Sequence, residues 1–98
     1  MKTENTQPRF IFQRRIDGVT YHYEPCETKG SHSLWKRVDK ELWVTYLPEL
    51  GWACVDRDKN ILGLPWAISI DKQHSLPPAG TWVSRKGDKS YVYDVIYS

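Results

Sequence analysis

The segment from Phe10 to Glu24, FIFQRRIDGVTYHYE, constrains the fold of this chain more than any other because it has the pattern of a β-hairpin. Asp17-Gly18 favours a two-residue type I′ turn, in which both turn residues have φ > 0. With this turn, the predicted partners are Ile16 and Val19, Arg14 and Tyr21, and Phe12 and Tyr23. The hairpin should therefore fix the register of the first two strands.

Side chains alternate between the two faces of a strand, so this register gives the hairpin one apolar face. The expected members of that face are Phe10, Phe12, Ile16, Val19, Tyr21 and Tyr23. A two-stranded hairpin is at best marginally stable in water. The rest of the chain must therefore supply the surface that covers this face.

Two similar hairpins are predicted in the second half of the chain. The first pairs Trp52–Asp56 with a strand that starts at Ile61, and the second pairs Thr81–Arg85 with Ser90–Tyr97. The short segments between the paired strands are charged and contain Asn or Gly, as turns commonly do.

The stretch from Leu34 to Leu47 fits two patterns. As a helix near residues 33–43, it would place Leu34, Val38 and Leu42 on one face, with Ser33 as its N-cap. As two strands, residues 34–38 and 42–47 would flank a turn, and LWVTYL has the aromatic and β-branched content of a strand. The β character of the surrounding segments favours the strands.

The most apolar run of the chain is Ile61–Ile70, ILGLPWAISI, and Gly63 and Pro65 interrupt it. Proline cannot donate a hydrogen bond to a neighbouring strand, so a straight central strand through Pro65 is not expected. The segment should bulge or split into two short strands around Gly63–Trp66.

Together these segments predict a mainly β protein with about seven or eight short antiparallel strands. Turn residues at regular intervals are typical of a small meander, barrel or sandwich. A helix near residues 33–43 would make the fold α+β instead. The 98 residues form a single domain, which we place at residues 9–98, after a flexible polar arm at residues 1–8.

The charge and hydropathy patterns exclude some classes of partner. The chain has 14 basic and 12 acidic residues, and a net charge of +2 does not by itself indicate nucleic acid. No segment is long and apolar enough to span a membrane, and residues 1–9 lack the apolar run of a signal peptide. We therefore expect a cytoplasmic protein with no membrane partner, in which Cys26 and Cys54 are free thiols.

Patterns that would indicate catalysis or metal binding are weak. His22, Cys26 and His32 lie close in the sequence, but their spacing lacks the tight pairs of zinc sites, so no metal is expected. No third residue is identified that would complete a catalytic triad with His74-Ser75, and no phosphate-binding glycine loop occurs. We therefore expect a protein that is not an enzyme and carries no cofactor.

Five Trp and six Tyr in 98 residues favour recognition of another macromolecule, since large rings dominate protein interfaces. The predicted function is protein binding, as an adaptor or as an inhibitor that docks on a larger protein. The main anchor would be Leu64–Trp66, a proline-stiffened apolar bulge, although Leu64 and Trp66 could equally plug the end of a barrel. The expected partner-binding residues are Leu64, Pro65, Trp66, Tyr93, Trp35 and Arg14.

The alternative function is binding of single-stranded nucleic acid by a small β-barrel, with bases stacked on rings and phosphates held by Arg and Lys. The residues that could supply this charge are Arg14, Arg15, Lys36, Arg37, Arg85, Lys86 and Lys89. Trp35 or Tyr93 would be the stacking platform. Acidic residues interspersed among the basic ones weigh against this function. A small-molecule ligand is less favoured still, since a chain this short offers only a surface groove or a modest pocket.

Overall fold

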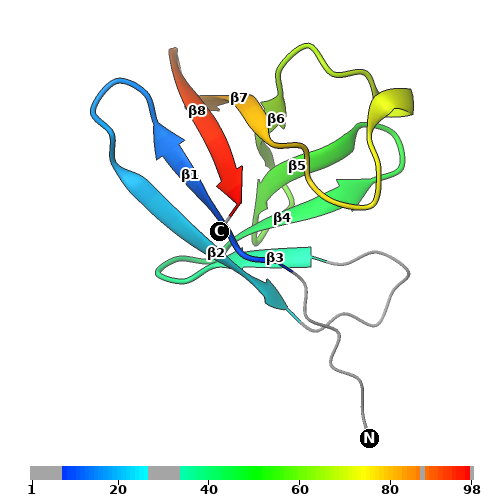
Figure 1. The fold of residues 1–98 in the computed structure, drawn as a ribbon, viewed down its shortest axis with the longest axis horizontal. Helices are drawn as coiled ribbons and strands as arrows, with labels where there is room; N and C mark the ends of the chain where they lie inside the picture. The colour runs from blue at the N-terminus through cyan, green and yellow to red at the C-terminus, as the bar shows by residue number, and fades with distance from the viewer. Residues whose placement is uncertain (1–7, 27–33, 87, 98) are drawn as a thin grey trace, which may run out of the picture.

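The computed structural model describes residues 8–26, 34–86 and 88–97, and within them eight strands form a closed antiparallel barrel (Figure 1). The predicted mainly β fold and the predicted number of strands are therefore confirmed. Of the three predicted architectures, meander, barrel and sandwich, the structure has the barrel. One 3₁₀ turn, η1 (Ile70–Lys72), lies between β6 and β7. The strands are β1 (Phe10–Arg14), β2 (Thr20–Cys26), β3 (Leu34–Arg37), β4 (Leu42–Leu47), β5 (Gly51–Asp56), β6 (Ile61–Pro65), β7 (Gly80–Lys86) and β8 (Lys89–Tyr97).

Each strand pairs with the next along the chain, and the pairing of β1 with β8 closes the barrel. Phe10 lies opposite Tyr97 and Arg14 opposite Tyr93, so the blue and red strands of Figure 1 run side by side. Residues 34–47 form β3 and β4, which pair through Trp35 and Val44, so the helical alternative is wrong. The turns between β1 and β2, β3 and β4, β5 and β6, and β7 and β8 all lie at one end of this up-and-down barrel.

The first hairpin forms with a register that differs from the predicted one by two residues. Phe12 pairs with Tyr21 rather than Tyr23, and only Gly18 of the turn dipeptide has a positive φ, of 73°. The carboxylate of Asp17 instead accepts hydrogen bonds from the Val19 N–H and from the Arg14 guanidinium. These side-chain bonds stabilise a longer loop over residues 15–19, which the dipeptide rule does not consider.

Because the register changes by an even number of residues, the inward face of the hairpin is largely as predicted. Phe10, Phe12 and Tyr23 are buried inside the barrel. Ile16 and Val19 are exceptions, with exposed fractions of 81% and 38%, because the longer loop removes them from the strands.

The two later hairpins form as predicted, by β5 with β6 and by β7 with β8. The pairing of β5 with β6 shifts between Cys54 and Val55, which leaves Leu62 as the extra residue of a bulge. Strand β6 ends at Pro65, as expected for a residue without an N–H group. The predicted interruption is therefore present, although the bulge lies one residue before Gly63.

The interior of the barrel is filled mainly by aromatic rings. Phe10 stacks on Tyr23 with ring centroids 5.4 Å apart, and Phe12 contacts Trp82 edge to face at 5.1 Å. Trp35 and Trp52 meet edge to face at 5.7 Å, and neither has any exposed surface. Large rings bury much apolar area per residue, which explains how so short a chain encloses a stable core.

Segments outside the strands close the barrel end opposite the hairpin turns. The buried indole N–H groups of Trp35, Trp52 and Trp82 donate to backbone carbonyls of Pro8, His74 and Pro78, at 2.7, 3.0 and 2.8 Å. The backbone of Pro8 thus contacts the barrel, and residues 1–7 of the predicted arm lie outside the described part of the chain. The hairpin turns lie at the opposite end.

Candidate functional site

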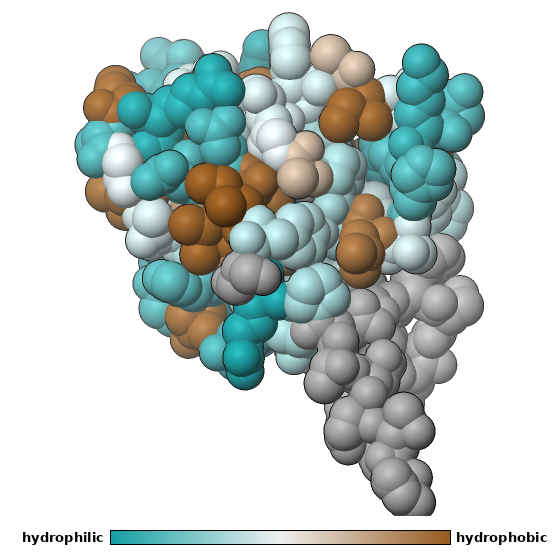
Figure 2. All heavy atoms as spheres, in the orientation of Figure 1, coloured by the Kyte–Doolittle hydropathy of each residue, from teal (hydrophilic) through white to brown (hydrophobic). Residues whose placement is uncertain are grey.

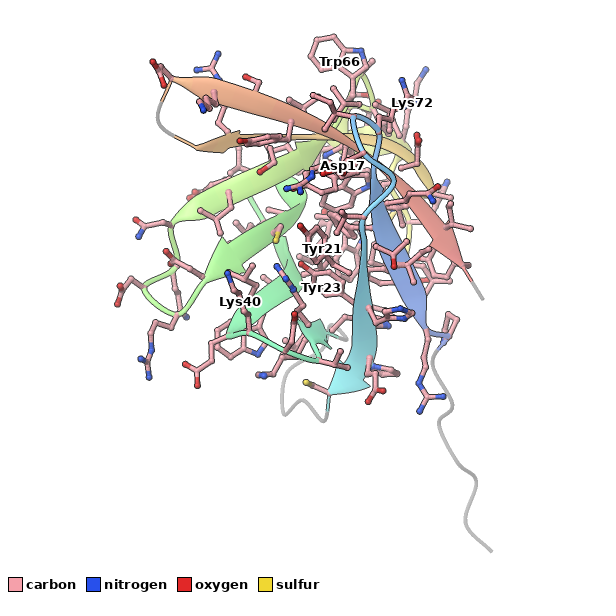
Figure 3. All side chains as sticks on the ribbon, turned by 90° about the vertical axis from the view of Figure 1, so that its left-hand side faces the viewer. Asp17, Tyr21, Tyr23, Lys40, Trp66 and Lys72 are labelled. Carbon is pink, nitrogen blue, oxygen red and sulfur yellow. The ribbon has the colours of Figure 1, made fainter. Side chains whose placement is uncertain are left out.

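The barrel opens at the end of the hairpin turns into a cavity of about 300 Å³. Its walls include rings from β1, β2, β7 and β8, namely Phe12, Tyr21, Tyr23, Trp82 and Tyr93, and we call this cavity the mouth pocket. Figure 3 shows Tyr21 and Tyr23 on the inward side of β2. Barrel mouths are common ligand sites, and about 300 Å³ lies at the lower end of the usual volume of such sites.

Four cations, Arg14, Arg37, Lys40 and Arg85, line the mouth pocket. Among the described residues that line it, none is Asp or Glu. The whole chain is nearly balanced in charge, at +2, so this cluster of one sign is a local feature. Cavities lined by charges of one sign attract ligands of the opposite sign.

Two of these cations are held against one ring. The guanidinium carbons of Arg37 and Arg14 lie 3.9 Å and 5.7 Å from the centroid of Tyr21, within the range of cation–π contact. The Arg37 side chain retains only 11% of its exposure. Tyr21 therefore fixes the positions of both guanidinium groups at the entrance to the pocket.

Aspartates in the neighbouring turns complete the positioning of these arginines. Asp17 pairs with Nε and Nη2 of Arg14, and Asp39 pairs with the same two nitrogens of Arg37. The bonds from Arg14 and Arg37 lower the pKa values of the Asp17 and Asp39 carboxyl groups, so both remain ionised at neutral pH. A guanidinium has five N–H donors, and each arginine therefore keeps donors for a further acceptor.

Lys40 and Arg85 differ from this pair because neither forms an ion pair with a described residue. Both side chains are exposed at the rim. Their charges are consequently not neutralised locally, and they supply the net positive potential of the pocket.

The deepest polar groups of the pocket are inert. The Tyr23 hydroxyl and the Cys54 Sγ lie 3.6 Å apart, and burial raises the pKa of each group above its ordinary value. Cys54 thus stays a thiol at neutral pH rather than becoming a nucleophilic thiolate. No carboxylate or imidazole occurs among the described lining residues.

A second candidate surface lies on the outside of β6, β7 and β8. Val83 pairs with Leu64 on one side and Val92 on the other, and alternation with the buried Trp82 places all three on the outer face. Trp66 follows directly after β6, is 63% exposed, and projects away from the barrel in Figure 3. We call Leu64, Trp66, Val83 and Val92 the outer strip.

The predicted partner-binding residues thus fall into separate groups. Arg14 and Tyr93 line the mouth pocket, whereas Leu64 and Trp66 belong to the outer strip. Pro65 is half-buried at the end of β6. Trp35 was wrongly expected to contact a partner, because its ring is fully buried among other rings and its N–H bonds to the Pro8 carbonyl.

Tyr21 and Lys40 line the pocket but were not among the predicted contacts, and Arg37 and Arg85 were expected only as phosphate-binding residues of the alternative function. They share a position in the sequence, since each lies within or close to a hairpin turn. Basic and aromatic residues that flank the turns at one end of a meander would have indicated a pocket at that end of the barrel.

The described segments hold neither a cluster of metal ligands nor a helix that could span a membrane. Residues 8–26, 34–86 and 88–97 contain no group of three or more His, Cys, Asp or Glu residues placed to hold a metal ion. Of the weak metal motif, His22 and Cys26 are described, whereas His32 lies outside the described residues. No helix within those segments has the length and hydropathy needed to cross a membrane.

Apolar side chains on the face drawn in Figure 2 form several small groups separated by polar ones. The mouth pocket is therefore better defined, by its charge and its volume, than any apolar area on that face. Comparison with protein-family models, with curated proteins and with solved structures finds no match to this chain.

Proposed function

We propose that this chain is a small non-enzymatic binding module that captures another protein by accepting one of the partner's anionic groups into the mouth pocket. The observation that carries this proposal is the concentration of Arg14, Arg37, Lys40 and Arg85 around a cavity with no described Asp or Glu in its lining. Arginine clusters are a recurring means of recognising acidic and phosphorylated protein motifs. An adaptor or an inhibitor would both use such a site.

The surroundings of the mouth favour a single anionic group over a polyanion. Each of the four hairpin turns at this end carries an exposed aspartate, namely Asp17, Asp39, Asp58 and Asp88. Successive phosphates of a nucleic acid strand crossing the mouth would approach these carboxylates and be repelled. One acidic side chain or one terminal carboxylate can enter between them, which supports a protein partner.

The outer strip supports a protein partner independently. A Trp side chain with 63% exposure next to the half-buried Leu64, Val83 and Val92 has the composition of an interface anchor. Trp66 would contribute contact area, and the mouth pocket would contribute specificity for charge.

The test is a selection of random displayed peptides on the immobilised protein. We expect enrichment of sequences with Asp, Glu or an essential C-terminal carboxylate, and loss of their binding to the K40Q/R85Q double variant. The R9Q/R57Q double variant is the matched control, because it loses the same charge from two arginines outside the pocket, paired with Glu24 and Glu41.

Selected peptides without any acidic group, or equal binding to both double variants, would contradict the proposal. Labelled single-stranded DNA is titrated in parallel at low salt. Salt-sensitive DNA binding that K40Q/R85Q abolishes, with no peptide enriched, would assign the pocket to nucleic acid instead.

A further inference from the structure

We infer that the group accepted by the mouth pocket is an aromatic ring that carries an anionic substituent, such as an aryl phosphate or an aryl carboxylate. This inference rests on the proposed function, since it specifies the anion that the pocket takes. It follows from three properties of the cavity, which are its floor, its rim and its size.

The floor of the pocket is made of rings. The centroid of Phe12 lies 4.9 Å from that of Tyr23, 5.1 Å from that of Trp82 and 5.8 Å from that of Tyr93. The polar hydroxyl of Tyr23 faces the Cys54 thiol. Phe12, Tyr23 and Trp82 are almost completely covered, whereas Tyr93 is only half-buried. An aromatic ligand ring would pack on the open side of Tyr93 in stacked or edge-to-face contact, and a small hydrated anion would not.

The rim carries the charge. Arg14 and Arg37 lie beside Tyr21, above the floor, and Asp17 and Asp39 each occupy only two donor nitrogens of their arginine. Planar guanidinium groups bind carboxylates and phosphates through two parallel hydrogen bonds. A neutral ring would leave these donors bonded to water alone. A ligand that has both an aromatic ring and an anionic group would contact the floor and the rim at once.

The size of the cavity limits the aromatic part. A volume of about 300 Å³ is small for a ligand site, and the rings of the floor already occupy the barrel interior below it. One ring with one anionic group is therefore expected to enter, and larger polycyclic ligands are not. Such a group occurs both as a phosphotyrosine side chain and as a free aryl phosphate.

The experiment titrates four probes into the isotope-labelled protein and follows the backbone N–H signals by NMR, because the indole N–H of Trp82 faces the closed end of the barrel. Phenyl phosphate has ring and charge, cyclohexyl phosphate has charge and similar bulk without aromaticity, phenol has the ring alone, and inorganic phosphate has the charge alone. Trp82 lines the pocket and Trp66 lies outside it, so the Trp82 signal should shift while the Trp66 signal stays.

We expect phenyl phosphate to bind about tenfold or more tightly than each other probe, because only it uses both the floor and the rim. K40Q/R85Q should weaken its binding about tenfold, and R9Q/R57Q should not. Retained dispersion of the backbone N–H signals in each variant would show that the barrel is intact.

The outcomes separate the two proposals. Equal binding of phenyl phosphate and of inorganic or cyclohexyl phosphate would overturn the aromatic inference and leave the anion site standing. Absence of any anion-dependent shift of Trp82 would overturn both. N-acetyl-phosphotyrosine amide distinguishes the sources, because binding of phenyl phosphate without binding of this amide would support the aromatic anion and contradict a protein partner.

Discussion

The side-chain oxygen of Gln73 accepts a hydrogen bond from the backbone N–H of Trp52 at 2.8 Å. The amide nitrogen of the same side chain donates to the Ile68 carbonyl at 3.1 Å. Gln73 therefore joins the start of β5 to the long segment between β6 and β7, which covers the closed end of the barrel. Gly51 is adjacent to this contact and has a φ of 85°.

We predict that Gly51→Ala destabilises the protein by about 2–4 kcal/mol, because it adds strain at a positive φ to a steric clash. A Cβ at Gly51 would lie 2.4 Å from the Gln73 oxygen and would displace it from the Trp52 N–H. Gly18→Ala is the control, since Gly18 also has a positive φ but nothing lies within 4 Å of its added Cβ. Urea unfolding should show the larger loss for Gly51→Ala, and equal losses would mean that Gln73 moves aside without cost.

Trp66 and Trp35 should respond oppositely to truncation. Trp66→Ala should change the free energy of unfolding by about 0.5 kcal/mol or less, since its ring is mostly exposed, and should weaken capture of a protein partner. Trp35→Ala should cost about 3–5 kcal/mol, because it leaves a cavity among buried rings. A loss of stability from Trp66→Ala comparable to that from Trp35→Ala would assign Trp66 to the core.

Alkaline pH should destabilise the barrel through its tyrosines. Burial raises the pKa of Tyr97 from 10.0 to about 12, so the unfolded chain releases this proton at a lower pH than the folded one. The stabilising effect is complete below pH 10 and is lost as the pH rises towards 12.

Tyr97→Phe tests this effect. It should reduce the fall in unfolding free energy over this pH range, while the lost hydrogen bond to the Pro77 carbonyl costs about 1 kcal/mol at neutral pH. An unchanged pH slope in the variant, measured by denaturant unfolding, would show that Tyr97 does not contribute.

The two thiols should react at very different rates with a disulfide reagent. Cys26 is half-exposed near the end of β2, whereas Cys54 is 6% exposed and burial raises the pKa of its thiol. We expect one rapid reaction in the native protein, lost in Cys26→Ser, and a slow one that is limited by opening of the barrel. Rapid reaction of Cys54 would show that its thiol is accessible to the reagent without opening of the barrel.

The hairpins were predictable from sequence because their signals are local. Turn residues and alternating side chains identified β1 with β2, β5 with β6 and β7 with β8, and they also favoured strands over a helix at residues 34–47. The register of the first hairpin was not predictable from Asp17-Gly18 alone. It depends on two side-chain bonds of Asp17, one of them to Arg14.

The mouth pocket could not be predicted in the same way, because its lining comes from residues far apart in the chain. Arg14 and Tyr93 are brought together only by the pairing of β1 with β8, and no local pattern indicates that pairing. The burial of Trp35 was unpredictable for the same reason. Its alternation within β3 shows which face it shares with Arg37, but the closed barrel decides that this face is the interior.

The pairing of β1 with β8 has a further consequence for how partners can bind. Each of the described strands has a paired neighbour on both sides, so closure leaves no free edge strand. An extended peptide therefore cannot join this sheet as an added strand, and neither can a strand from a second copy. Recognition has to run through side chains and turns, and self-association into ribbon-like fibrils would first require the ring-filled interior to come apart.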